Sequence, residues 1–472
     1  MQKVLVCLLG VVIWASAGSV KAERVNIGPA QRTALGVTLY SNGLALISDR
    51  RKFELSSGNN ELWFSGVSPM MVAESVQLKS DGALKITEQG LLPANLNHRE
   101  LLKAYVGKTI KIIKTNPSTG EEKQLDAKVI VVEPNLILRI DGQFVTSSSG
   151  ILAFPEIPKE LRAKPIFRIV GRVDAKGPGS AHLQYLAQGL SWRADHVASF
   201  DRQTNKLNLQ TRATLVNQSG IDLMGSHMQM IAGQVKQATP RNRMPREQKL
   251  MMAEAVAVDR QAPSERQAMG GFHLYSLSEP VDLPDRMSKQ VSLLQPQSFP
   301  AKRILVSENQ PNIYGHNGGA VYPSHPVIQI EFLNDRKSGA KQPLPSGILR
   351  LYGSDKNQKT QFLGEDNLAS LPVGEKAKIR TGQAFDVTVR RKQTDFKRDV
   401  MGRNTFEAAF EITTLNGGNK PELVKLVENM SGEWAITEQS EVHIRDGNQV
   451  YWPVTVPAGG KSTITYRVRV RR

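Results

Sequence analysis

Apolar and polar residues alternate along most of this chain, and a period of two is typical of half-buried β-strands. The clearest case is the segment 463–471, in which one face carries Ile464, Tyr466, Val468 and Val470. The other face carries three arginines, which could form a binding stripe but are better explained as a solvated face. We therefore expect a strand with one buried and one wet face.

Short paired strands follow the same pattern near the beginning of the chain. Segments 37–40 and 44–47 flank an Asn-Gly pair, which tolerates the positive φ of a tight hairpin turn. Segments 52–55 and 62–64 predict a second hairpin. Strands at this spacing are typical of sandwiches and barrels. The predicted fold class is all-β, with several domains built from antiparallel β-sandwiches.

The pattern also predicts how the chain is divided. Residues 23–97 form an N-terminal β-hairpin region, and residues 98–160 a small barrel-like β insertion next to a short helical stretch at 97–105. Longer strands fill residues 168–472, the predicted β-sandwich region. It is interrupted at 239–270 by prolines and charged residues without apolar periodicity, which predicts a mobile loop.

Residues 1–22 have the parts of a secretory signal peptide. Lys3 supplies a positive charge, residues 4–14 are an unbroken apolar run, and Ala22 ends a stretch of small residues. The run is shorter than the roughly 20 residues that a membrane-spanning helix needs, so an uncleaved anchor is the less favoured alternative. We expect a periplasmic or secreted mature chain that begins near Glu23 and has no membrane span.

The cysteine content and the net charge further limit the kinds of site and partner that we expect. Cys7 is the only cysteine and lies within the apolar run, so we expect a mature chain without disulfide, thiolate nucleophile or cysteine-bound metal. The net charge is +17, and +15 without Lys3 and Lys21. This charge favours an anionic partner in the cell envelope, or it simply maintains solubility. Nucleic acid is not an expected partner of an exported protein.

The usual catalytic motifs are missing from the sequence. There is no phosphate-binding glycine loop, no His-Glu-x-x-His and no Gly-x-Ser-x-Gly. The nearest phrase, at 189–193, lacks the second glycine of a nucleophile elbow. The histidines are far apart in the sequence. We therefore assign no catalytic, cofactor-binding or metal-binding residue.

One cluster nevertheless has ligands that suit Cu(I). Met224, His227, Met228 and Met230 combine thioethers with an imidazole. Their alternation, however, puts Met228 and Met230 on the opposite face of a strand from His227, and methionine is a common core residue. The pattern favours a core role for these two methionines over a shared metal.

Two further sets of residues have a structural and a functional interpretation. His316 and His325 could form a metal pair across loops, but no third ligand is near them in sequence, and ordinary loop histidines are favoured. Four tryptophans could stack on sugars, although their places in or beside strand patterns favour core packing: Trp63, Trp192, Trp434 and Trp452.

Several phrases in the second half of the chain occur in the order found in one bacterial family. They are residues 213–220, 344–352, 361–366, 382–387, 391–396, 428–434 and 454–460. Over roughly 168–472 the chain resembles the family called domain of unknown function 4139. The resemblance implies a β-sandwich fold and no established activity. The phrases themselves set no acid beside a base and are typical of turns and strand starts.

Two departures from this family pattern matter. Relatives often carry a long coiled coil where this chain has the short β insertion. They also often have His-Thr-Pro where this chain has Ser370-Leu371-Pro372. Any role that relatives give to that histidine is therefore missing here.

The favoured function is that of an exported, non-enzymatic binding or scaffold protein of the cell envelope, whose partner is a protein or an anionic polymer. The alternative is a hydrolase acting on envelope polysaccharide or peptide, with a site assembled from loops. A carboxylate cluster, or a histidine beside a serine, in one cleft would favour the hydrolase. A broad groove or basic face without such a cluster would favour binding.

Overall fold

The structure, a computed structural model, describes residues 22–81, 84–146, 150–233, 235–236, 271–337, 342–354, 357, 359–400 and 404–471. Nearly all the regular secondary structure in these residues is β-strand, which confirms the predicted fold class. The predicted signal peptide and the predicted mobile loop at 239–270 lie outside the described residues, apart from Ala22. No helix among the described residues is long and apolar enough to cross a membrane.

The chain divides into two compact units, which we describe separately. The first comprises Met1–Ser191, Val216–Met230 and Ser276–Ser288, and the second comprises Trp192–Leu215, Ile231–Tyr275 and Lys289–Arg472.

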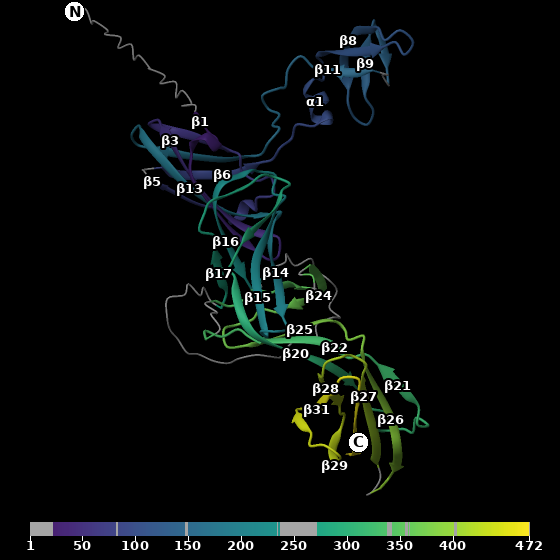
Figure 1. The fold of residues 1–472 in the computed structure, drawn as a ribbon. Helices are drawn as coiled ribbons and strands as arrows, with labels where there is room; N and C mark the ends of the chain where they lie inside the picture. Colours follow the sequence, from purple (N-terminus) through teal and green to yellow (C-terminus); the bar gives the residue numbers. More distant parts are fainter. Residues whose placement is uncertain are drawn as a thin grey trace, which may run out of the picture. The chain divides into compact units, whose positions relative to one another are not determined.

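Two sheets carry most of the N-terminal strands (Figure 1). The smaller has the order β1 (Glu23–Ile27), β4 (Gly58–Ser65), β12 (Ile166–Val173), β6 (Lys85–Leu92). The larger has the order β17 (His273–Ser276), β16 (Leu223–Ala232), β2 (Arg32–Tyr40), β3 (Leu44–Leu55), β13 (Gly177–Gln188), β5 (Gln77–Asp81), with β18 (Val281–Leu283) on β16.

The first predicted hairpin is confirmed in the larger of these sheets. β2 and β3 pair antiparallel, with Leu39 opposite Ala45, and Gly43 supplies the positive φ of the turn between them. Inward-facing residues of the two sheets, such as Ile47 and Phe64, are fully buried. The second predicted hairpin is wrong, because segment 52–55 lies in β3 of the larger sheet and segment 62–64 lies in β4 of the smaller one.

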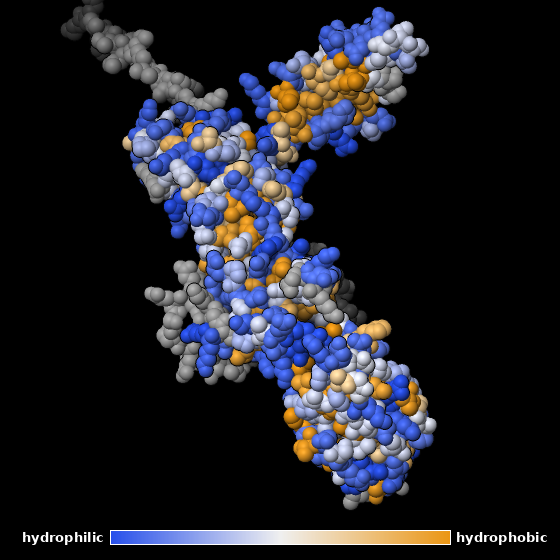
Figure 2. All heavy atoms as spheres, in the orientation of Figure 1, coloured by the Kyte–Doolittle hydropathy of each residue, from blue (hydrophilic) through white to orange (hydrophobic). Residues whose placement is uncertain are grey.

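The predicted insertion is a separate five-stranded sheet beside a short helix. The helix α1 (His98–Ala104) begins after Asn97, whose side chain caps it by accepting the Glu100 N–H at 3.0 Å. The strand order is β10 (Gln143–Val145), β9 (Ile137–Ile140), β8 (Glu122–Val131), β7 (Thr109–Thr115), β11 (Ile151–Ala153). The described parts of β10 and β11 do not pair, so this sheet is open at both edges. Figure 2 shows apolar side chains gathered on it.

The second unit contains a large sheet and a five-stranded sheet. The large sheet has the order β24 (Thr360–Leu368), β23 (Gly347–Ser354), β14 (Leu190–Asp201), β15 (Lys206–Asn217), β20 (Gln297–Asn309), β28 (Glu422–Asn429), β31 (Gln449–Val456), β30 (Ile444–Asp446), with β19 (Ser288–Ser292), β22 (Val327–Leu333) and β25 (Lys376–Gln383) alongside. The five-stranded sheet has the order β21 (Val321–Ser324), β26 (Val387–Arg398), β27 (Thr405–Asn416), β32 (Lys461–Arg471), β29 (Glu433–Gln439).

These two sheets of the second unit pack face to face. A single core cluster contains Leu426 and Trp452 from the large sheet together with Phe410, Ile464 and Val468 from the five-stranded sheet. A shared core of this kind is the defining feature of a β-sandwich. We call this part of the second unit the C-terminal sandwich.

The last strand, β32, has the predicted buried face, and its other face is exposed at Thr465 and Arg471 and half-buried at Arg467 and Arg469. Arg467 Nη1 lies 2.8 Å from a carboxylate oxygen of Asp395, and Arg469 Nη2 lies 3.0 Å from Glu407. Only Arg471 of the three arginines is exposed. Acidic residues of β26 and β27 pair with Arg467 and Arg469, because the sheet brings these strands together from distant parts of the sequence.

Candidate functional site

One end of the C-terminal sandwich is built from loops that include two of the phrases singled out in the sequence. Its four segments are residues 325–326, 384–387, 416–420 and 457–460, and we call them the loop end. Backbone hydrogen bonds join them: Ala384 N–H donates to Pro326 O at 2.9 Å, and Gly417 N–H donates to Asp386 O at 2.8 Å. The loop end is therefore a connected structure and not a set of independent turns.

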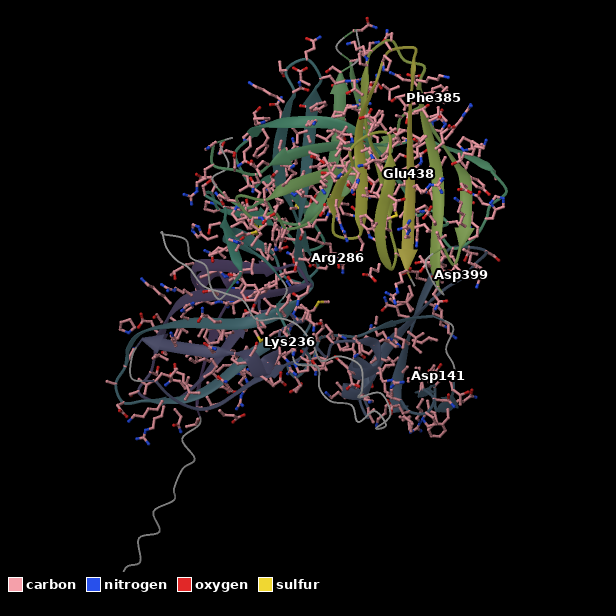
Figure 3. All side chains as sticks on the ribbon, turned by 90° about the horizontal axis from the view of Figure 1, so that it is seen from below. Asp141, Lys236, Arg286, Phe385, Asp399 and Glu438 are labelled. Atoms are coloured by element: carbon pink, nitrogen blue, oxygen red, sulfur yellow. The ribbon has the colours of Figure 1, made fainter. Side chains whose placement is uncertain are left out.

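Phe385 is the prominent side chain of the loop end. It is 90% exposed, whereas its neighbours Ala384 and Val387 are buried. Figure 3 labels Phe385 beside the ends of the C-terminal strands. Exposure of one large aromatic ring between two buried neighbours costs hydrophobic free energy in the free protein. Such a residue is a candidate contact for a partner.

His325 holds the turn that presents Phe385. Its Nδ1 lies 3.1 Å from the carbonyl oxygen of Ala384 and 2.9 Å from that of Val387. Carbonyl oxygens only accept hydrogen bonds, so Nδ1 is the protonated nitrogen and donates. The imidazole thus fixes the backbone on both sides of Phe385.

A buried asparagine connects the other two loops. The Asn416 side chain donates to Lys420 O at 2.9 Å and to Pro457 O at 3.1 Å, and its oxygen accepts the Gly418 N–H at 2.9 Å. Its backbone N–H donates to Gly460 O at 2.9 Å. Buried amides that are satisfied in this way rigidify the loops around them.

The exposed side chains of the loop end include charged residues as well as Phe385. Asp386, Lys420 and Lys461 are exposed, so charges of both signs lie in the loop end or next to it in the sequence. A rigid aromatic with mixed charges around it is the usual composition of a protein-interface anchor.

The structure separates the four residues of the predicted copper alternative. Met228 and Met230 are buried in the strand β16, while His227 and Met224 are exposed. The predicted alternation of inward methionines and an outward histidine is confirmed. Because the side chains point to opposite faces, the four cannot surround one ion.

The two loop histidines have separate roles. His316 packs 6.5 Å from the Phe396 ring, measured between ring centroids, while His325 binds backbone carbonyls. Among the described residues, no three His, Cys, Asp or Glu side chains are grouped so that they could hold a metal.

The tryptophans pack largely as predicted. Three are buried, namely Trp192, Trp434 and Trp452. Trp63 is half-buried, and the Arg24 guanidinium carbon lies 3.8 Å from the centre of its ring.

The structure also brings together a serine and a histidine that the sequence did not connect. Ser48 Oγ on β3 lies 2.6 Å from His182 Nε2 on β13. The strand register places Arg50 and Lys79 directly opposite His182, on the same face of the sheet. Two neighbouring cations oppose the imidazolium that a general base must form. These cations weigh against His182 as the general base of a serine hydrolase.

The match to a known family covers only part of the first unit. Residues 37–91 match the model of an N-terminal domain of unknown function, number 4140. They run from β2 to β6. No curated protein matches the chain. The match supports a likeness to a family of unknown function, in a different part of the chain from the resemblance to family 4139, and it indicates no activity.

Proposed function

We propose that this chain is an exported, non-enzymatic binding protein of the cell envelope and that the loop end of its C-terminal sandwich contacts a partner protein. The signal-like residues 1–22 support export. The resemblance of residues 168–472 to domain of unknown function 4139 is part of this proposal, because the family phrases at 382–387 and 454–460 lie in the loop end.

The observation that carries the proposal is the presentation of Phe385. The ring is 90% exposed, yet the backbone around it is fixed by His325 and by the Gly417 N–H. Binding through a rigid aromatic loses little conformational entropy, which is why such side chains dominate interface energetics.

The test is capture of partners from envelope extract by the mature protein and its F385A variant. We expect at least one protein to be retained by the wild type and reduced at least about tenfold by F385A, as for an interface hot spot. Because Phe385 packs against little of its own chain, its removal should leave thermal unfolding unchanged.

The matched control is F144A, which removes another exposed phenylalanine, on β10 of the insertion. It should retain the same proteins as the wild type. Equal capture by all three proteins would exclude the loop end as the contact. Loss of capture with F144A alone would assign the contact to the insertion. The capture is also repeated at high salt. A contact driven by charge should weaken there, whereas a contact made by the Phe385 ring should not.

The hydrolase alternative has one observation in its favour, the short contact between Ser48 and His182. The cations opposite His182 weigh against it. Labelling of the protein by a fluorophosphonate probe, with loss of the label in S48A, is the result that would establish this alternative instead.

A further inference from the structure

A cleft in the first unit is independent of the loop end. It encloses about 900 Å³. The start of β2, residues 66–69 and the beginning of β16 line it, together with the chain on either side of the insertion. Every lining residue belongs to the first unit. A cleft of this size is in the range of small-molecule sites.

Most of the cleft wall is apolar. Pro29, Pro69, Pro165 and Ile221 contribute rigid or branched surfaces. Met224 also lines the cleft and is 50% exposed. Methionine is flexible and polarisable, so an exposed methionine adapts to apolar ligands of different shape.

The cleft also contains a positively charged group held in a fixed orientation. Arg32 Nε and Nη2 donate to the two carboxylate oxygens of Asp49 at 3.0 and 2.9 Å. Its side chain is 14% exposed. No described residue accepts a hydrogen bond from its third nitrogen, Nη1. A guanidinium held in this way is ready to donate to an oxyanion.

Two further cations, Lys164 and Arg286, line the same cleft. The acidic residues among them are engaged with the backbone. Asp285 accepts the Gly220 N–H at 2.8 Å, and Asp222 accepts the Asp285 N–H at 2.9 Å. Arg286 is 90% exposed and its Nε lies 3.6 Å from Asp285 Oδ2, so it forms an exposed ion pair at the rim.

We infer that this cleft binds a small amphiphile whose head is a carboxylate or a phosphate. The head accepts from Arg32, with Lys164 and Arg286 adding positive charge around it. The apolar tail lies along the proline-rich wall and Met224. This ligand site is additional to the partner contact proposed for the loop end.

The test is calorimetric titration of the mature protein with dodecyl phosphate below its critical micelle concentration. Titration with dodecanoate shows which of the two head groups binds more tightly. Inorganic phosphate tests the head without a tail, and dodecyl maltoside tests the tail without an anionic head. The double variant K164Q/R286N removes two cations without touching the buried Arg32–Asp49 pair. Asparagine tolerates the positive φ of residue 286, which is 61°. The control is K176Q, an exposed lysine of the first unit that does not line the cleft.

We expect the wild type and K176Q to bind an anionic amphiphile equally and K164Q/R286N to bind it at least about tenfold more weakly, because charge-assisted hydrogen bonds are lost. Dodecyl maltoside and inorganic phosphate should each bind more weakly than the anionic amphiphile. Equal binding by the three proteins, equally tight binding of dodecyl maltoside, or no binding of either anionic amphiphile would overturn the inference.

Discussion

Each of the two units buries a carboxylate beside arginine, but the two sites differ in the number of guanidinium groups. In the first unit, Asp49 is fully buried and contacts both Arg32 and Arg51. Arg51 is itself 1% exposed and donates onward to Ile27 O at 2.8 Å and to Ser65 O at 2.6 Å. Burial opposes ionisation of Asp49, yet the hydrogen bonds and charge of the two arginines outweigh it and lower the pKa of this carboxyl.

The corresponding group in the second unit is Glu428, which is also fully buried. It has one guanidinium partner, Arg391, whose Nε lies 2.6 Å from its Oε1. The Asn309 amide donates to its other oxygen at 2.7 Å. Here burial dominates and raises the pKa of Glu428, because the charge and hydrogen bonds of Arg391 offset it only in part.

The comparison teaches that an arginine beside a buried carboxylate does not by itself determine its ionisation. Two guanidinium groups hold Asp49 as an anion, so this site is an electrostatic part of the first unit's core. The partners of Glu428 offset its burial only in part, so its pKa is raised. Removal of charge should therefore affect the two sites very differently.

The largest expected effect is that of D49N. The substitution leaves Arg51 buried with its charge no longer compensated, and breaking a buried pair in this way costs about 3–5 kcal/mol of unfolding free energy. Because the two units need not unfold together, the measurement is hydrogen exchange over peptides of β3, which reports local opening.

The control for D49N is D174N, which removes an exposed carboxylate of the same unit whose oxygen lies 3.5 Å from Lys85 Nζ. It should change stability by less than about 1 kcal/mol, as is usual for exposed ion pairs. Similar small losses for both variants would mean that Asp49 contributes no more than a surface charge.

The sequence indicated where these groups lie but not what they contact. The alternation of β3 runs inward through Ile47, Asp49, Arg51 and Phe53, so a charged pair on a buried face could have been read from the pattern. The third member, Arg32, becomes a neighbour only through the pairing of β2 with β3. The pairing of Glu428 is even harder to predict from the sequence, because its partner Arg391 lies on a different sheet.

For the loop end, too, the sequence indicated the position of the residues but not their contacts. The phrase 382–387 was identified but interpreted as the start of a strand. This is correct from Val387 onward. The exposure of Phe385 two residues earlier cannot be read from alternation, since it depends on how His325 and Asn416 fix the loops. Phenylalanine in a sequence normally indicates core, and here that expectation fails.

The next largest effect is in the pH dependence, where the two carboxylates should act in opposite directions. The pKa of Asp49 is lowered by folding, so its stabilisation is present above about pH 4 and is lost as the pH falls through the folded-state pKa. The pKa of Glu428 is raised, so its stabilisation is present below about pH 4 and is lost as the pH rises through the folded-state pKa.

The unfolding free energies of D49N and E428Q relative to wild type should therefore change in different pH ranges. Between pH 7 and pH 5, the difference in unfolding free energy between wild type and D49N should stay constant. This difference should become smaller only below about pH 4. As the pH falls from 7 to about 4, wild type should gain stability relative to E428Q, by at most about 1.4 kcal/mol per pH unit for one proton. Hydrogen exchange over β28 measures this gain. A loss relative to E428Q would contradict the raised pKa.

The smallest expected effect is that of E428Q at pH 7. Glutamine keeps an oxygen for the Arg391 guanidinium, and the Asn309 amide can turn to present its own oxygen to the new NH₂ group. The burial of a carboxylate charge is removed at the same time, so the unfolding free energy should stay within about 1 kcal/mol of wild type. The matched control is E438Q on β29, an exposed partner of Arg467. If E428Q instead cost 3 kcal/mol or more on the scale of a broken buried pair, Glu428 would be held as an anion like Asp49. The number of guanidinium partners would then not explain the difference between the two units.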